Sequence, residues 1–117
     1  MIEARGPDTT AGDKRKQLIR LFLQRTLGDI EQMRRDVPQL IAGQPAAWQE
    51  LRFASQRAAG MARSFDLEVL ANCVADLAAL AEQRFAGAAL EAQFLWSTTT
   101  AIEVAAIEAN RLLGELE

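Results

Sequence analysis

Residues 45–65 read P-A-A-W-Q-E-L-R-F-A-S-Q-R-A-A-G-M-A-R-S-F, and this stretch decides the fold. Pro45 suits the first position of a helix, where its missing N–H would have had no partner. Small and apolar residues then recur at steps of three and four, the period of an amphipathic helix. The predicted inward face consists of Trp48, Leu51, Ser55, Ala58, Ala62 and Phe65. The predicted outward face carries Arg52, Gln56, Ala59, Gly60 and Arg63.

The segment before this stretch shows the same period. We expect its helix to run from Asp13, with a possible short extra turn at residues 13–17, to about Val37. Pro38 has no N–H and disfavours helical backbone before it, so it ends or kinks the helix there, with a further short turn at Leu40 and Ile41. The predicted apolar face consists of Leu18, Ile19, Phe22, Leu23, Leu27, Ile30, Met33 and Val37.

Two more helices are expected after residue 65. Asp66 is a candidate N-cap for a helix that ends before Gly87, and a last helix is expected from about Ala88 to Leu113. The first of them is predicted to bury Leu67, Leu70, either Cys73 or Val74, Leu77, Leu80 and Ala81, and the second Leu90, Phe94, Leu95, Ala101, Ile102, Ala105, Leu112 and Leu116.

The predicted fold is all-α, an antiparallel up-and-down four-helix bundle. Long amphipathic helices joined by short loops become antiparallel neighbours, and the bundle is the simplest solution. Residues 13–117 would form this single domain. Residues 1–12 contain Gly6, Pro7 and Gly12, which are typical of loops, and are expected to be a flexible tail.

Composition excludes several classes of function. The net charge of −3 over 117 residues gives no reason to expect a nucleic-acid or membrane partner. The absence of histidine excludes imidazole acid–base chemistry and imidazole metal sites in this chain, and we expect no metal and no cofactor. The single Cys73 cannot form an internal disulfide, which favours the reducing cytoplasm.

The stretch at 48–77 resembles the histidine-containing phosphotransfer (HPt) domain of bacterial two-component relays. That family follows roughly W-x-x-L-x-x-x-A-H-x-L-K-G-S-A-x-x-L/F-G-L-x-x-L-A. This chain aligns with the pattern without a gap. The matching residues are Trp48, Leu51, Ser55, Gly60, Ala62, Phe65, Leu67, Leu70, Ala71 and Leu77. The resemblance extends to the helix before this stretch and to the long closing helix, and it implies the same four-helix fold.

The departures from the family pattern are concentrated at its chemical positions. Gln56 stands where the family has its phosphorylated histidine, and Ala59 where it has a lysine that helps to hold the phosphoryl charge. Ala58 replaces the leucine between them, and Asp66 replaces the glycine after Phe65. A glutamine amide is neither basic nor nucleophilic near neutral pH, so we expect no phosphotransfer and no enzyme activity.

The resemblance therefore implies an HPt-like module that docks without being phosphorylated. Its expected partner is a response-regulator receiver domain or a hybrid histidine kinase, whose acidic pocket suits a basic surface. The residues expected to bind this partner are Arg52, Ser55, Gln56, Arg57, Ala59, Gly60 and Arg63. An equally weighted interpretation is that the arginines are ordinary solvated helix charges.

The second function hypothesis is a structural or assembly protein that forms a homodimer through its long helices. Trp96 falls off the main apolar stripe of the last helix, so it could belong to a dimer interface. A half-buried tryptophan at the edge of the core would explain the same position.

Overall fold

The computed structural model describes residues 2–117, with side chains from Ala11 onward. Within this range the chain is all-helical. Its elements are α1 (Ile2–Arg35), α2 (Val37–Ile41), α3 (Pro45–Ser64), α4 (Glu68–Phe85) and α5 (Ala92–Leu116). The all-α prediction is confirmed.

The start of α1 differs from the prediction. The helix begins at Ile2 and not at Asp13, and it passes without a break through residues 13–17, so residues 2–12 are helical, while residue 1 lies outside the described residues. The physical reason is cooperativity: extending an existing helix adds one hydrogen bond for each residue fixed, whereas starting one is unfavourable. Gly12 opposes this extension by about 1 kcal/mol and Pro7, which lacks an N–H, by about 3 kcal/mol, so cooperativity accounts for residues 8–12 more readily than for residues 2–7.

The break between α1 and α3 follows the prediction. Asp36 is a turn residue, α2 is the short helix that carries Pro38 in its first turn, and Gly43 ends it with a φ of 74°. Gln44 is extended and places Pro45 at the start of α3. The two prolines therefore mark the boundaries that their missing N–H groups favour.

The turn between α3 and α4 corrects the role of Asp66. Its φ is 60°, in the left-handed region, and its N–H donates to the carbonyl of Arg63 at 3.0 Å. The N–H of Leu67 donates to the carbonyl of Ala62 at 2.8 Å. This pair of bonds is a Schellman motif, so Asp66 lies just past the end of α3, and Leu67, not Asp66, is the N-cap of α4.

The start of α5 is also later than predicted. Gly87, with a φ of 108°, ends α4 in a second Schellman motif, and residues 88–91 are not helical. Arg84 explains this segment, because its Nη1 donates to the carbonyl of Ala88 at 2.7 Å and occupies an acceptor that a helix would have used. The helix therefore starts at Ala92 rather than at about Ala88.

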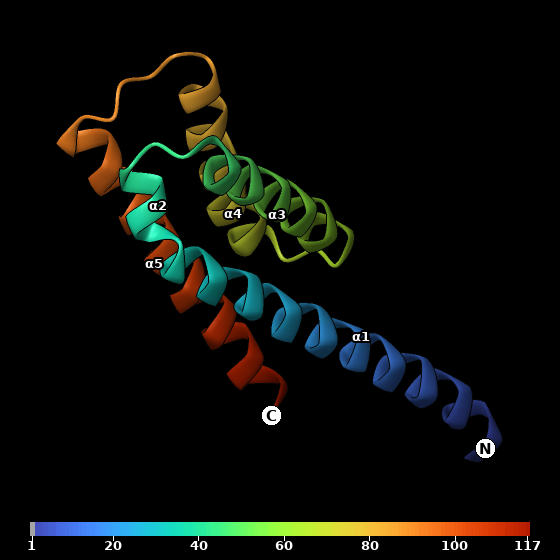
Figure 1. The fold of residues 1–117 in the computed structure, drawn as a ribbon. Coiled ribbons are helices and arrows are strands. Elements are labelled where there is room, and N and C mark those ends of the chain that lie inside the picture. The colour runs from blue at the N-terminus through green and yellow to red at the C-terminus, as the bar shows by residue number, and fades with distance from the viewer. Residues whose placement is uncertain (1) are drawn as a thin grey trace.

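The four long helices enclose one core. α1 packs along α5, α3 along α4, α4 contacts α5, and α1 contacts α3, so the long helices form a ring of neighbours. The molecule measures 63 × 22 × 20 Å because the N-terminal half of α1 extends past the other helices (Figure 1). The indole of Trp48 joins three elements: its Nε1 donates to the carbonyl of Leu40 at 3.0 Å, and its ring stacks on that of Phe94 at 5.6 Å.

The predicted inward faces are largely correct. The predicted inward residues of α3 are buried except Phe65, which is half-buried, and in α4 Val74 is buried while Cys73 is half-buried. Leu18 is the exception in α1, since 55% of its surface is exposed. It lies in the part of α1 where all residues from Ala11 to Leu18 are exposed, so no neighbouring helix covers it.

Candidate functional site

The site is built around Gln56 on α3. Its side chain is exposed, and its Nε2 donates to Oε1 of Glu82 on α4 at 3.1 Å. The same carboxylate lies 3.6 Å from Nη1 of Arg52, one turn earlier on α3. Glu82 thus holds both side chains from the neighbouring helix. The amide of Gln56 can donate and accept hydrogen bonds, but it is not a nucleophile near neutral pH.

Two exposed aromatic rings border this cluster. The guanidinium of Arg52 lies 4.3 Å from the ring centroid of Phe85 and 5.6 Å from that of Phe53. Phe53 is 49% exposed and Phe85 is 42% exposed. Phe53 precedes Gln56 by three residues, so both lie on the same face of α3. The surface around Gln56 is therefore a polar centre with an aromatic edge.

The other two arginines lie on either side of this surface. Nη2 of Arg57 is 3.2 Å from Oδ2 of Asp29 on α1, so it forms an ion pair across the α1–α3 contact. Arg63 lines a shallow hollow at the α3–α4 turn together with Asp66 and Glu68. The three predicted arginines thus face different neighbours, but all remain at least partly exposed on or beside the outer face of α3.

Two residues predicted for the partner-binding surface are buried. Ser55 is 0% exposed, and its Oγ donates to the carbonyl of Leu51 at 2.6 Å, within its own helix. Ala59 is 4% exposed, because α3 and α4 form the most extensive helix contact in the fold and bury several alanines there. Neither side chain can reach a partner. The prediction was wrong for Ala59 because a small residue gives no signal of which face it occupies.

Gly60 lies one turn beyond Gln56 and is exposed. A Cβ built on it would meet no other atom within 4 Å, and it has no left-handed backbone angle. The fold of the chain itself therefore does not require a glycine here. A glycine within a helix lowers stability by roughly 0.5–1 kcal/mol relative to alanine, so its presence needs another reason.

No activated nucleophile lies near Gln56 among the described residues. Ser55 is buried and its hydroxyl is already bonded. Cys73 is half-buried, and burial, reinforced by Glu108 and Asp76, raises the pKa of its thiol. A raised pKa keeps the thiol protonated and unreactive near neutral pH.

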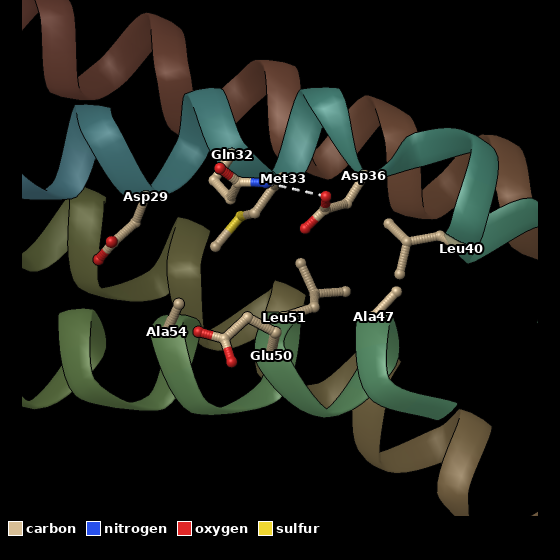
Figure 2. Close-up of a pocket in the computed structure, with 9 residues that line it drawn as sticks. All are labelled: Asp29, Gln32, Met33, Asp36, Leu40, Ala47, Glu50, Leu51 and Ala54. Atoms are coloured by element: carbon tan, nitrogen blue, oxygen red, sulfur yellow. Dashed lines mark hydrogen bonds between the residues drawn. The ribbon is translucent and has the colours of Figure 1, made fainter. Parts of the chain in front are cut away.

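A small acidic hollow lies beside the site, between α1, α2 and α3. Asp29, Asp36 and Glu50 line its rim, while Met33 from α1 and Leu51 from α3 point toward one another across its floor (Figure 2). Its volume of about 30 Å³ admits little more than a water molecule. Asp29 and Asp36 already accept hydrogen bonds from Arg57 and Gln32. Within the described part of the chain, no group of three or more carboxylate or thiol ligands is placed to hold a metal ion.

Sequence reasoning missed three residues of the surface: Phe53, Glu82 and Phe85. Phe53 could have been predicted, because a residue three positions before Gln56 lies on the same face of a helix. Glu82 and Phe85 lie on another helix, and only the packing of α3 against α4 brings them to Arg52 and Gln56.

Comparison with models of known protein families finds no match to this chain. Comparisons with curated proteins and with solved structures find no match either. Among the residues that the structure describes, no helix has both the length and the apolar character that crossing a membrane requires.

Proposed function

We propose that this chain is an HPt-like module that docks on a receiver domain, alone or within a hybrid histidine kinase, and does not accept a phosphoryl group. The proposal includes the bundle itself, with α1, α3, α4 and α5 as four antiparallel rods, and a place in the cytoplasm, where receiver domains act. By occupying a receiver, the module would compete with phosphorylatable relay proteins.

The first support is the agreement between burial and the family pattern on α3. Trp48 and Leu51 are buried where the pattern has its scaffold residues, and Ser55 is buried at the small position that precedes the histidine. Gln56, at the position of the histidine itself, is exposed. Burial and exposure at these four positions are compatible with the family pattern, although Ala59 is buried where the pattern has a lysine.

The second support is the backbone of Asp66. The family pattern has a glycine at this position, and here the residue takes a φ of 60° in a Schellman motif. Glycine adopts this conformation without a steric penalty, whereas other residues do so at a cost. The glycine of the family pattern and the left-handed backbone of this chain thus indicate the same kind of turn, although an aspartate does not favour it.

The observation that carries the proposal is the exposed Gln56 with an open Gly60 one turn later. A partner that approaches this turn meets an amide in place of an imidazole and finds no side chain in the way of the backbone. The amide can form hydrogen bonds but no phosphoramidate. This combination supports docking without transfer.

The surroundings of Gln56 suit a receiver. The arginines of this surface, with its aromatic edge, can meet an acidic pocket ringed by apolar residues when carboxylates of the partner replace Glu82 and Asp29. The ion pairs of Arg52 with Glu82 and of Arg57 with Asp29 are exposed enough to be worth only about 0–1 kcal/mol, so a partner carboxylate can displace them at small cost.

Calorimetric titration of this chain against the receiver domains of its own genome tests the proposal. Each receiver is used free and with beryllofluoride as the mimic of its phosphorylated state. We expect at least one receiver to bind with a Kd of roughly 1–100 μM, as transient signalling contacts do. If no receiver binds in either state, the proposal is wrong.

A matched pair of variants locates the contact. Gln56→Glu adds a negative charge at the centre of the proposed surface and should weaken binding at least about tenfold, which is about 1.4 kcal/mol. Gln24→Glu makes the same change at an exposed position on α1 and should leave the Kd unchanged. Equal effects of the two variants would count against docking through α3.

A further inference from the structure

The outer face of α5 is apolar as well as its inner face. Ile107 and Trp96 are 67% and 62% exposed, the highest values among the large apolar side chains described, and Val104 is 46% exposed. With Thr100 these residues follow steps of three and four, so they lie on one face. The opposite face buries Ile102, Ala105, Ala106 and Ala109 in the core. A helix that only closed the bundle would need the inner face alone.

Two arginines hold carboxylates beside this outer face. Arg34 of α1 donates to both carboxylate oxygens of Glu103, from Nε and Nη2, each at 2.7 Å. Arg111 likewise donates to both oxygens of Glu108, at 2.8 and 2.7 Å, and to Glu115 at 2.8 Å. Glu103 is thereby drawn toward α1. Arg111 is shared by two carboxylates, and Asp76 of α4, at the edge of this face, has no ion pair among the described residues, so the edge is acidic while the centre is apolar. The apolar centre fits a partner with an equally apolar face.

A hollow lies next to Trp96, between α4 and α5. Its lining includes Cys73 and Asp76 from α4 and Thr100, Ala101 and Val104 from α5, and its volume is about 240 Å³. The lining is mainly apolar, and small residues form its floor. A projecting side chain from outside, of the size of an isoleucine or part of an indole ring, could fill it.

We propose that two copies of this chain pair through their α5 helices, antiparallel, about a two-fold axis near Thr100. A two-fold axis requires a surface that is complementary to itself. Here Trp96 lies on one side of Thr100 and the two β-branched residues Val104 and Ile107 on the other. When the helix of the second copy runs in the opposite direction, Trp96 of each copy lies against Val104 and Ile107 of the other copy. Part of each indole then enters the hollow of the opposite copy.

The size of this face is that of a small interface. From Trp96 to Ile107 the helix rises about 17 Å at 1.5 Å per residue. Together with the edges of α4, such a contact would bury roughly 1,000 Å² in total, at the lower end of specific interfaces. We therefore expect a dimer that dissociates in the micromolar range.

The dimer is independent of the proposed receiver docking and compatible with it. α3 and α5 are not adjacent in the ring of long helices, and both bury their inner faces in the same core. Their outer faces therefore point away from one another, and pairing through α5 leaves both copies of the Gln56 surface accessible.

Sedimentation of the full chain over roughly 5 to 200 μM tests the dimer. We expect a concentration-dependent shift from monomer to dimer. Trp96→Ala and Ile107→Glu should both remain monomeric, with unchanged helical circular dichroism, because both side chains are exposed in the monomer. Ile41→Glu is the control: Ile41 is also exposed, at 52%, but lies at the end of α2. A wild-type chain that stays monomeric, or variants on α5 that dimerise as the wild type does, would overturn the proposal.

Cross-linking tests the two-fold axis separately. In a Cys73→Ser background, Thr100→Cys places a thiol near the axis, where a short bis-maleimide should join two copies. Gln56→Cys in the same background places it on the face away from the contact and should give no cross-linked dimer. Failure of Thr100→Cys to cross-link, or equal cross-linking of the two variants, contradicts an antiparallel α5 pair.

Discussion

The outer faces of α3 and α5 are both exposed but differ in kind. On α3, Arg52, Gln56 and Arg57 are each held by a carboxylate from a neighbouring helix. On α5, the exposed side chains of Trp96, Val104 and Ile107 are apolar, and the nearby carboxylates of Glu103 and Glu108 are held by arginines. The α3 face thus consists of polar groups whose intramolecular ion pairs can be exchanged for contacts with another molecule. The α5 face consists of apolar groups that no other side chain covers.

This difference indicates two kinds of contact. Exchanging exposed ion pairs changes the free energy little, so the α3 face suits a transient partner whose charge and orientation matter. Covering exposed apolar surface is favourable whatever the orientation of polar groups, so the α5 face suits association with an apolar face. The two tryptophans allow the sharpest test, because Trp48 lies on the inner face of α3 and Trp96 on the outer face of α5.

Replacing Trp48 by alanine should have the largest effect on folding. Trp48 is 1% exposed, stacks on Phe94 and donates to Leu40, so the variant should lose about 3–5 kcal/mol of unfolding free energy. Trp96→Ala should change it by no more than about 0.5 kcal/mol at concentrations where the chain is monomeric. Urea unfolding followed by circular dichroism measures both. Comparable losses would mean that the face of α5 contributes to the monomer core.

Ala59→Lys should have the next largest effect. Ala59 is buried between α3 and α4, so a lysine there must displace its neighbours or extend past them to bring its ammonium group to solvent. We expect the variant to lose about 1–3 kcal/mol of unfolding free energy. Gly60→Lys adds the same side chain at the next, open position and should cause no such loss. Restoring the lysine of the HPt pattern together with Gln56→His would therefore produce a destabilised chain. An Ala59→Lys variant as stable as the wild type would show that the α3–α4 contact opens readily.

The fold was predictable where the signal is local. Pro38 and Pro45 lack an N–H, which fixes where helices end or begin, and the period of Trp48, Leu51 and Ser55 identifies the inner face of α3. The left-handed backbone of Asp66 was not predictable, because aspartate is more often an N-cap and only the distance between α3 and α4 requires the tighter turn. Within the site, the exposure of Gln56 followed from the period of the helix. The burial of Ala59 and the contacts of Glu82 did not, because they depend on which helix packs against which.

Gly60→Ala should separate folding from docking. The added Cβ meets nothing in the chain, and alanine favours the helix, so the variant should gain about 0.5–1 kcal/mol of unfolding free energy. The same methyl group should weaken receiver binding if the partner approaches the backbone at this turn. Ala46→Gly, at an exposed position in the first turn of α3, is the control for helix propensity alone. A gain in stability with unchanged binding would place the contact elsewhere on α3.

Asp66→Gly should also stabilise the chain, by about 0.5 kcal/mol or slightly more. Glycine takes a φ near 60° without the clash that a Cβ introduces, although it loses more conformational freedom on folding. The ion pair with Arg15 that the change removes is 3.6 Å long and exposed, so its loss matters little. Asp66→Ala, which keeps a Cβ but removes the charge, separates the two contributions. A glycine variant less stable than the wild type would indicate that the carboxylate of Asp66 holds the turn.

The smallest expected effect concerns the ion pairs beside α5. A hydrogen bond from Arg34 lowers the pKa of Glu103 below the ordinary value of glutamate. A carboxylate whose pKa is lower in the folded state stabilises the fold above its unfolded pKa, and this contribution is lost as the pH falls through the folded pKa. Because Glu103 is 55% exposed, the contribution should be no more than about 0.5 kcal/mol. Urea unfolding of the wild type and of Arg34→Gln should therefore differ slightly at about pH 6 and converge at about pH 3. A difference that persists in acid would mean that Arg34 acts through packing on α5 and not through its charge.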